Sequence, residues 1–473
     1  MNAPFVCSIF RINASVKRGF GLTIILYIVK NVEIENFIQI KPSRYTAPAA
    51  WGDEDDQHNE NQPAARGARM NKPLAGLKVV EVAMWAFVPA AAGILADMGA
   101  EVIKVEPPTG DPLRGLQIGA LATGNHGFVL SWENYNRGKR SITLDLKQEE
   151  GVQVLYKLLE GADVFITSLL PAARRAMKID VPDIQARFPN LIYALGSSLG
   201  RNGPEAEKGG YDSITFWARG GIASSITPDD EDAPIGPPGA AFGDCASAAM
   251  LAGGVAAAVA QRAITGKASV VDVSLLSASM WLLQRGITQA TIDGIEKLPR
   301  PKRDAVTNPL VNTYRTKDGR FVALCMLQGQ RYWAGFCAAA SRPDLAADPR
   351  FETAAARAKN IAACTAEMDA LFVSKTMAEW REILARQDGQ WDVVQHVGEL
   401  KGDAQVQANG FLQRVDYGGG RAMDMVSVPM QFDGVPLVAS PAPDVGADSD
   451  DILTALGYDE QGIIDLKIAG VVF

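Results

Sequence analysis

Asp244 is the residue whose setting in this chain most clearly suggests chemistry. It lies in Phe242-Gly243-Asp244-Cys245 and heads a run of small apolar residues that reaches Ile264 with Arg262 as its one charged member. Two interpretations fit this pattern. Asp is a favoured helix N-cap, and its charge suits the positive end of the helix macrodipole. A carboxylate that is shielded from water is also suited to act as a nucleophile.

Other reactive side chains are scarce. The chain has three histidines, His58, His126 and His396, too few for a histidine-rich metal site, and we interpret them as surface or structural residues. The five cysteines are Cys7, Cys245, Cys325, Cys337 and Cys364. None of them forms a CxxC pair, so neither a zinc site nor a disulfide framework is indicated. We expect a reducing, cytoplasmic setting, no metal and no permanently bound cofactor.

Charge and hydropathy exclude two classes of partner. The formal charge of -8 and the pI near 5.2 argue against nucleic acid, because binding to phosphates requires a basic face. The apolar run over residues 19–29 is too short to span a bilayer and lacks a small-residue cleavage site. We therefore expect no membrane association.

From residue 77 onward, apolar strand patterns alternate with helical patterns. The expected strands cover 77–82, 102–105, 141–146, 163–167, 191–195 and 269–275, and the expected helices cover 90–98, 148–159 and the run after Asp244. This alternation predicts an α/β fold with a Rossmann-like parallel sheet, whose ligand crevice lies at the carboxyl ends of the strands. No GxGxxG follows the first strand, so the dinucleotide fingerprint is absent.

Changes in composition divide the chain into five parts. Residues 1–69, which include an acidic, amide-rich stretch, are predicted to be disordered or an artefactual extension. Residues 70–290 form the large α/β domain. A segment rich in Lys, Arg and Pro around 285–306 is typical of a linker, with 291–306 as its central part. Residues 307–405 are predicted to form a small α+β domain with a hairpin turn at 317–319 and helices from 334 to about 387. Residues 406–473 return to the large domain, with a helix over 450–456.

Several motifs in order resemble the family III CoA-transferases, which include formyl-CoA and carnitine CoA-transferases and have the α-methylacyl-CoA racemases as relatives. They are the 73–82 segment PLAGLKVVEV, the 96–114 segment ADMGAEVIKVEPPTGDPLR, the 136–147 segment NRGKRSITLDLK, Gly210-Tyr211-Asp212 and Gly243-Asp244. The resemblance covers about residues 73–473.

The resemblance implies that Asp244 is the nucleophile of CoA transfer from an acyl-CoA thioester to a carboxylic acid. Asp244 attacks the thioester to form a mixed anhydride, and the CoA thiolate then converts this into an aspartyl-CoA thioester. Neither a metal nor nucleotide hydrolysis is needed, and Asp244 is cap and nucleophile at once. CoA and acyl-CoA are substrates, and an interlocked homodimer is implied.

The resemblance also implies contacts with CoA and with the acyl group. The CoA contacts are Leu144, Asp145, Leu146, Lys147, Ser168, Leu169, Lys208 and Tyr211. Ser168 and Leu169 stand where the family commonly has Asn-Phe, which puts that contact in doubt. Trp85, Ala86 and Phe87 replace a more polar segment of the thioester pocket. These aromatic residues favour an acid less polar than formate or oxalate, unless they belong to the core.

Two alternatives remain open. An α-methylacyl-CoA racemase moves a proton between two acid/base groups, and its relatives place a histidine where this chain has Tyr211. Tyrosine is a poor base near neutral pH, which favours the transferase. The other alternative is a CoA-binding protein without catalysis, in which Asp244 only caps its helix.

Overall fold

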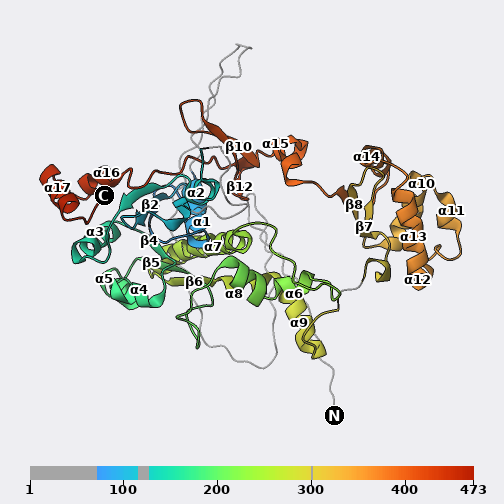
Figure 1. The fold of residues 1–473 in the computed structure, drawn as a ribbon, viewed down its shortest axis with the longest axis horizontal. Helices are drawn as coiled ribbons and strands as arrows, with labels where there is room; N and C mark the ends of the chain where they lie inside the picture. Colours follow the sequence, from blue (N-terminus) through green and yellow to red (C-terminus); the bar gives the residue numbers. More distant parts are fainter. Residues whose placement is uncertain (1–71, 116–126, 300–301) are drawn as a thin grey trace, which may run out of the picture. The chain divides into compact units, whose positions relative to one another are not determined.

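The largest sheet of the chain has six strands in the part that the structure describes (Figure 1). The computed structural model describes residues 72–115, 127–299 and 302–473; the extension predicted over 1–69 and His126 lie outside the described residues. The strands are β1 (Lys78–Val82), β2 (Glu101–Glu106), β3 (Arg140–Thr143), β4 (Val164–Thr167), β5 (Ile192–Ser197) and β6 (Val270–Ser274). All neighbours pair in parallel in the order β3-β2-β1-β4-β5-β6. The predicted Rossmann-like parallel sheet is confirmed.

Alternate side chains of these strands enter two separate cores, as the period of two in a strand requires. Val79 faces the core that also contains α1 (Phe87–Asp97) and α7 (Phe242–Thr265). Val80 faces the core that contains α3 (Glu149–Glu160), α16 (Ser449–Ala455) and α17 (Glu460–Ile468). Helices therefore cover both faces of the sheet, and α16 and α17 bring the end of the chain back to it, as Figure 1 shows.

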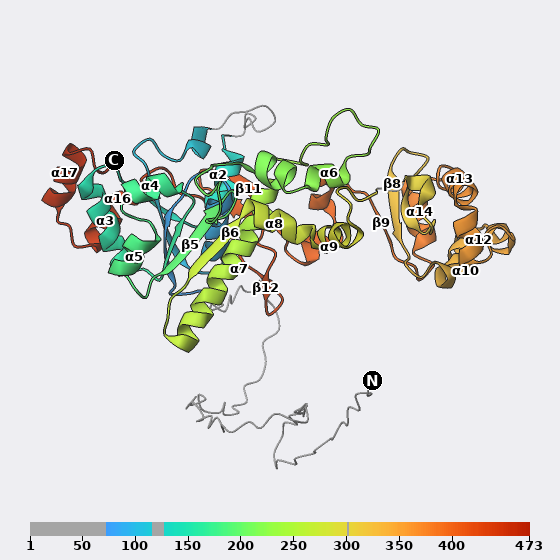
Figure 2. The same cartoon turned by 90° about the horizontal axis from the view of Figure 1, so that it is seen from below.

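The long helix α7 packs along α1, β5 and β6 (Figure 2). By length and composition alone it could also cross a membrane. Its buried residues repeat every three or four positions, from Gly243 through Leu251 to Ala258, which is the stripe of a core helix. Small side chains allow close approach: a Cβ added at Gly254 would lie 2.8 Å from Val271.

Shorter helices lie between the strands of this sheet or follow β6. They are α2 (Leu130–Asn136), α4 (Pro171–Ala176), α5 (Val181–Arg187), a π-helix over Ser213–Arg219, α6 (Ile222–Ile226), α8 (Leu275–Leu282), α9 (Gln284–Asp293) and 3-10 turns over Pro112–Gly115 and Arg303–Ala305. Helix α9 corrects the expectation of a linker from residue 285, since the chain stays helical to Asp293. None of its residues is buried within the chain, and its apolar side chains Ile287 and Ile292 are exposed.

A third core has all its buried members between Leu310 and Val393. The predicted hairpin is present as β7 (Val311–Arg315) and β8 (Phe321–Cys325), and β9 (Trp391–Val393) adds a strand that the sequence did not predict. The surrounding helices are α10 (Gly329–Ala339), α11 (Pro343–Ala347), α12 (Ala354–Lys359), α13 (Ile361–Phe372) and α14 (Met377–Leu384). The expected helical segment is thus five helices around a small antiparallel sheet.

The remaining elements lead back to the large sheet. They are a 3-10 turn over Val397–Gly402, α15 (Ala404–Ala408), and the hairpins β10 (Leu412–Asp416) with β11 (Ala422–Val426) and β12 (Gln431–Phe432) with β13 (Val435–Pro436). Tyr417 donates a hydrogen bond of 2.8 Å to Glu133 of α2. At the end of the chain, the N–H of Phe473 donates to Thr143 at the end of β3.

Candidate active site

A cavity of about 450 Å³ opens at the carboxyl ends of β1, β4 and β5. Its walls come from the segments that follow these strands, which start at Met84, Ser168 and Ser198, and from Tyr211 and Asp244. In a doubly wound sheet, ligands bind where the strand order reverses, here between β1 and β4. The sequence predicted this crevice, and the sheet order explains why residues so far apart in the chain meet there.

Asp244 reaches the cavity from the first turn of α7. The N-cap of this helix is Ala241, whose φ of 56° is in the left-handed region, and Asp244 lies three residues further on. The interpretation of Asp244 as the N-cap is therefore wrong. Its position in the first turn still places the carboxylate at the positive end of the helix, where a negative charge is stabilised.

A second carboxylate, Asp212, holds the start of α7. It is 7% exposed and accepts a hydrogen bond of 3.1 Å from the N–H of Gly243. A Cβ on Gly243 would lie 2.5 Å from Asp212 Oδ1 and 2.2 Å from the ring of Phe216, so only glycine fits between them. Asp212 therefore contacts Gly243, the residue directly before Asp244, both through this hydrogen bond and through close packing.

Burial controls the electrostatics of this pair. It raises the pKa of Asp244 to about 7, and the negative charge of Asp212 adds to the shift. Burial also raises the pKa of Asp212, although the N–H groups of Gly243 and Phe242 oppose this. Such a raised carboxyl pKa is typical of a functional site, because a surface carboxylate stays near 4.

Trp85, which also lines the cavity, has an unusual backbone conformation. Its φ is 71°, a left-handed value that bulky residues rarely adopt. Its indole meets the ring of Tyr211 edge to face, with centroids 5.8 Å apart, and 59% of Tyr211 is exposed. Ser168 accepts a 3.2 Å hydrogen bond from the N–H of Met84, so the ends of β1 and β4 are joined at the cavity.

Eight of the twelve residues predicted for the site line this cavity. They are Trp85, Ala86, Phe87, Ser168, Leu169, Lys208, Tyr211 and Asp244. The four others, Leu144 to Lys147, do not line it. Leu144 and Leu146 are buried in the core, and the N–H of Asp145 donates to the carbonyl of Val471. Their role in CoA binding stays a prediction.

The sequence did not predict several polar groups of the cavity. Arg174 and Arg201 bring positive charge to its wall, Ser197 ends β5, and Ser198 follows it. Tyr135 of α2 lies near Asp244 and Cys245, whose charges add to the effect of burial in raising the pKa of its phenol. The position of Ser197 and Ser198 at a strand end was a usable signal; the approach of Tyr135 depends on tertiary packing alone.

No group of three or more His, Cys, Asp or Glu residues suited to a metal ion occurs within 72–115, 127–299 and 302–473.

Comparison with known proteins identifies the family. The family model described as CoA-transferase family III matches residues 74–449. The chain belongs to CoA-transferase family III. Its mixed α/β fold agrees with that of a CAIB/BAIF family protein from Brucella suis, with a TM-score of 0.70 at 28% identity over 82% of this chain and 100% of the other.

Two curated relatives are similar over almost their whole length. The (R)-2-hydroxy-4-methylpentanoate CoA-transferase of Clostridioides difficile is 32% identical over 84% of this chain and 99% of its own. The cinnamoyl-CoA:phenyllactate CoA-transferase of Clostridium sporogenes is 31% identical over 83% of this chain and 96% of its own. This family III chain is therefore a CoA-transferase, and its substrates are an acyl-CoA and an acid.

Proposed function

We propose that Asp244 is the nucleophile that carries the acyl group and then CoA during transfer. The observation that carries this proposal is its place in the cavity, on the first turn of α7, with a carboxyl pKa raised to about 7 by burial and by the charge of Asp212. At pH values above 7 the carboxylate is ionised, and its incomplete solvation makes it a stronger nucleophile than a surface aspartate.

The steps of the reaction follow from this assignment. A carboxylate oxygen of Asp244 attacks the thioester carbonyl and the C–S bond breaks. CoA leaves as a thiolate, and the acyl group and Asp244 form a mixed anhydride. The thiolate attacks the aspartyl carbonyl, which releases the first acid as a carboxylate and leaves an aspartyl-CoA thioester. The second acid attacks this thioester, and the same steps in reverse order give the new acyl-CoA and free Asp244. The positive end of the α7 macrodipole stabilises the negative charge that develops in these steps.

We further propose that the acid carries an apolar side chain. Trp85, Phe87 and Leu275 give the cavity that Asp244 also lines an apolar wall, which suits a hydrocarbon better than a second carboxylate. The names of the two relatives agree, because 4-methylpentanoate and phenyllactate both carry hydrocarbon groups. Arg201 and Lys208 are candidates for the negatively charged groups of CoA, whereas Arg174 is buried and pairs with Asp180 at 2.9 Å.

Chemical trapping tests the nucleophile. The protein is incubated with a branched-chain or aryl acyl-CoA and treated with hydroxylamine, which converts an aspartyl thioester or anhydride into a hydroxamate. Peptide mass spectrometry then locates the label, and we expect it on Asp244. Asp244→Asn should give no label and no transfer, and protein without acyl-CoA is the blank.

The neighbouring carboxylate provides the sharpest alternative outcome. A label on Asp212, or full transfer activity in Asp244→Asn, would refute the assignment of Asp244 as the nucleophile.

A panel of acyl-CoA donors and acids, scored by chromatography, tests the preference for an apolar acid. Faster transfer to formate or oxalate than to any apolar acid would contradict this preference.

We also propose that the chain acts as a homodimer, as the family resemblance implies. Several apolar side chains of α8 and α9 are exposed, including Trp281 at 61% and Ile292 at 76%, and a second copy would cover them. Sedimentation equilibrium tests this proposal, and a monomer mass at micromolar concentration would contradict it.

A further inference from the structure

We infer that buried charged residues behind the cavity, centred on Lys104 and Asp111, are positioning residues that hold the Trp85 wall in place and thereby set acyl selectivity. The statement about selectivity rests on the proposed function, whereas the statement about the wall does not.

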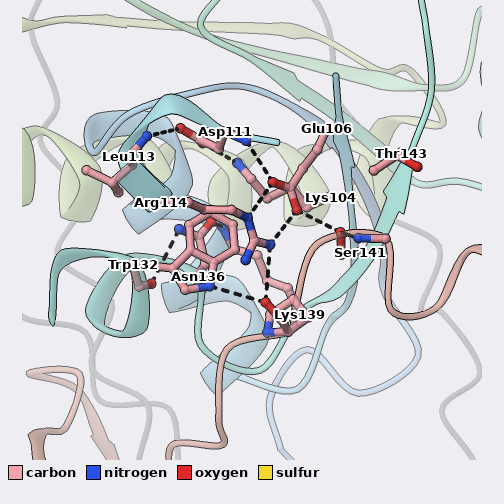
Figure 3. A network of polar contacts seen from close by, with 12 residues as sticks. Lys104, Glu106, Asp111, Leu113, Arg114, Trp132, Asn136, Lys139, Ser141 and Thr143 are labelled. Atoms are coloured by element: carbon pink, nitrogen blue, oxygen red, sulfur yellow. Dashed lines mark hydrogen bonds and ion pairs between the residues drawn. The ribbon is translucent and has the colours of Figure 1, made fainter. Parts of the chain in front are cut away.

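The network consists of charges with almost no access to solvent. Lys104 Nζ lies 2.8 Å from Glu81 and 2.9 Å from Asp111, and Lys139 Nζ lies 2.6 Å from the other oxygen of Glu81. These four residues are at most 6% exposed, and Figure 3 shows Lys104, Asp111 and Lys139 among their polar partners. Burial alone raises the pKa of Glu81, but the two ammonium groups more than reverse this, so Glu81 stays ionised.

A second layer fixes the loop that carries Asp111. Glu106 accepts two hydrogen bonds, of 2.8 and 2.7 Å, from Arg114, one of 2.7 Å from Ser141, and one of 2.9 Å from the N–H of Asp111. The guanidinium of Arg114 stacks on Trp132 at 3.5 Å from the ring centroid, as Figure 3 shows. The Asp111 carboxylate therefore has little freedom to move.

Three members of the network contact the backbone of the cavity wall. Lys104 donates a 2.9 Å hydrogen bond to the carbonyl of Ala83, and Lys139 donates one of 2.8 Å to the carbonyl of Pro89. Between these points, the N–H of Trp85 donates to Asp111 Oδ1 at 3.2 Å. The wall segment is thus attached before, at and after the residues that face the cavity.

The attachment at Trp85 coincides with its strained backbone. A left-handed conformation at a bulky residue persists only where the surrounding structure imposes it. The hydrogen bond to Asp111 and the buried charges around it supply that constraint. Without it, Trp85 relaxes toward an ordinary backbone conformation and its indole leaves its place against Tyr211.

The network touches the cavity only through this wall. None of Glu81, Lys104, Asp111 and Lys139 lines the cavity, and all four are too deeply buried to meet a substrate. Their influence on the reaction therefore passes through Trp85, Ala86 and Phe87, which shape the space beside Asp244. A shifted wall alters the fit of a large acyl group far more than that of acetyl.

Asp111→Ala and Asp111→Asn separate positioning from charge pairing. Asp111→Ala removes the acceptor for Trp85, while Lys104 keeps Glu81 and the carbonyl of Ala83. Asp111→Asn keeps an oxygen for the Trp85 N–H but removes the charge. Asp97→Ala is the matched control, because Asp97 is 2% exposed and its carboxylate pairs with Arg137 rather than with the wall.

Two measurements on the full chain decide the inference. In hydrogen–deuterium exchange, we expect the amides of residues 84–88 to exchange at least about tenfold faster in Asp111→Ala, to recover in Asp111→Asn, and to stay unchanged in Asp97→Ala. In transfer assays, the ratio of kcat/KM for a branched or aryl acyl-CoA to that for acetyl-CoA should change at least about tenfold in Asp111→Ala only.

The outcomes distinguish this inference from the proposed function. If Asp111→Ala and Asp97→Ala match in exchange over 84–88 and in the selectivity ratio, the positioning role is wrong and the network only stabilises the fold. If the wild-type chain transfers no CoA in any pairing but Asp111→Ala still speeds exchange over 84–88, the proposed function fails while the role in holding the wall stands. If Asp111→Ala does not fold, Asp111→Asn decides: wild-type exchange over 84–88 supports the role of the Trp85 hydrogen bond, and faster exchange there refutes it.

Discussion

Asp244→Asn should make the protein more stable while abolishing transfer. In the native state the pKa of Asp244 is raised to about 7 by burial and by Asp212, from an ordinary value of 3.8. A shift of about three units corresponds to about 4 kcal/mol at 1.36 kcal/mol per unit. Local relaxation and water entry reduce such penalties, so we expect a gain of about 1–3 kcal/mol from the neutral amide above pH 7.

Because the native pKa of Asp244 is raised, the stability difference between Asp244→Asn and the wild type depends on pH. Below about pH 4 the carboxyl is protonated in both folded and unfolded chains, so Asp244→Asn and the wild type should be equally stable. Between about pH 4 and 7 the unfolded chain ionises while the native site resists ionisation, and the wild type loses stability. Above about pH 7 the difference should remain constant.

Thermal melts at pH 4, 6 and 8 measure the effect. At about 2–4 °C per kcal/mol, Asp244→Asn should melt roughly 2–12 °C above the wild type at pH 8 and level with it at pH 4. Glu382→Gln, which removes an exposed carboxylate on α14, is the control and should show no such trend. A difference that does not vary with pH, or a less stable Asp244→Asn at pH 8, would refute the electrostatic reasoning.

Two further predictions concern the same helix start. Because the ionised form of Asp244 is the nucleophile, kcat/KM should rise about tenfold per pH unit below about 7 and level off above it; a profile flat from pH 5 to 8 would contradict this. Gly243→Ala places a Cβ 2.2 Å from Phe216, so it should destabilise the fold by about 1–3 kcal/mol and lower transfer. Gly253→Ala on the same helix meets nothing within 4 Å and should be neutral or slightly stabilising, and equal effects of the two would count against the packing argument.

The sequence was sufficient to predict the sheet because its strands carry their own signal. Segments such as Val164–Thr167 are apolar on both faces, as a strand covered by helices on each side requires. Helix α9 was missed for the opposite reason, since none of its residues is buried within the chain. Asp244 was placed correctly in a helix start but wrongly at the cap, because the left-handed turn at Ala241 has no signature in residue type.

Motif order predicted most of the cavity wall but not how it is supported. Trp85 and Tyr211 were expected near the site, but their edge-to-face contact depends on elements 126 positions apart in the chain. The ion pairs among Glu81, Lys104 and Asp111 join two of the family motifs, and the sequence did not predict them. They depend on burial, and burial follows from packing across β1, β2 and β3.

The buried charges also bear on how sequences of this family are sorted. A search pattern built on Glu81, Lys104, Asp111 and Lys139 selects chains that form the same support, because no substrate reaches these side chains. Such a pattern groups proteins that share this support, and it does not separate them by the acids that they accept. Subfamilies with different acids should instead separate at positions 84–87, where a single exchange alters the space beside Asp244 and leaves the ion pairs intact.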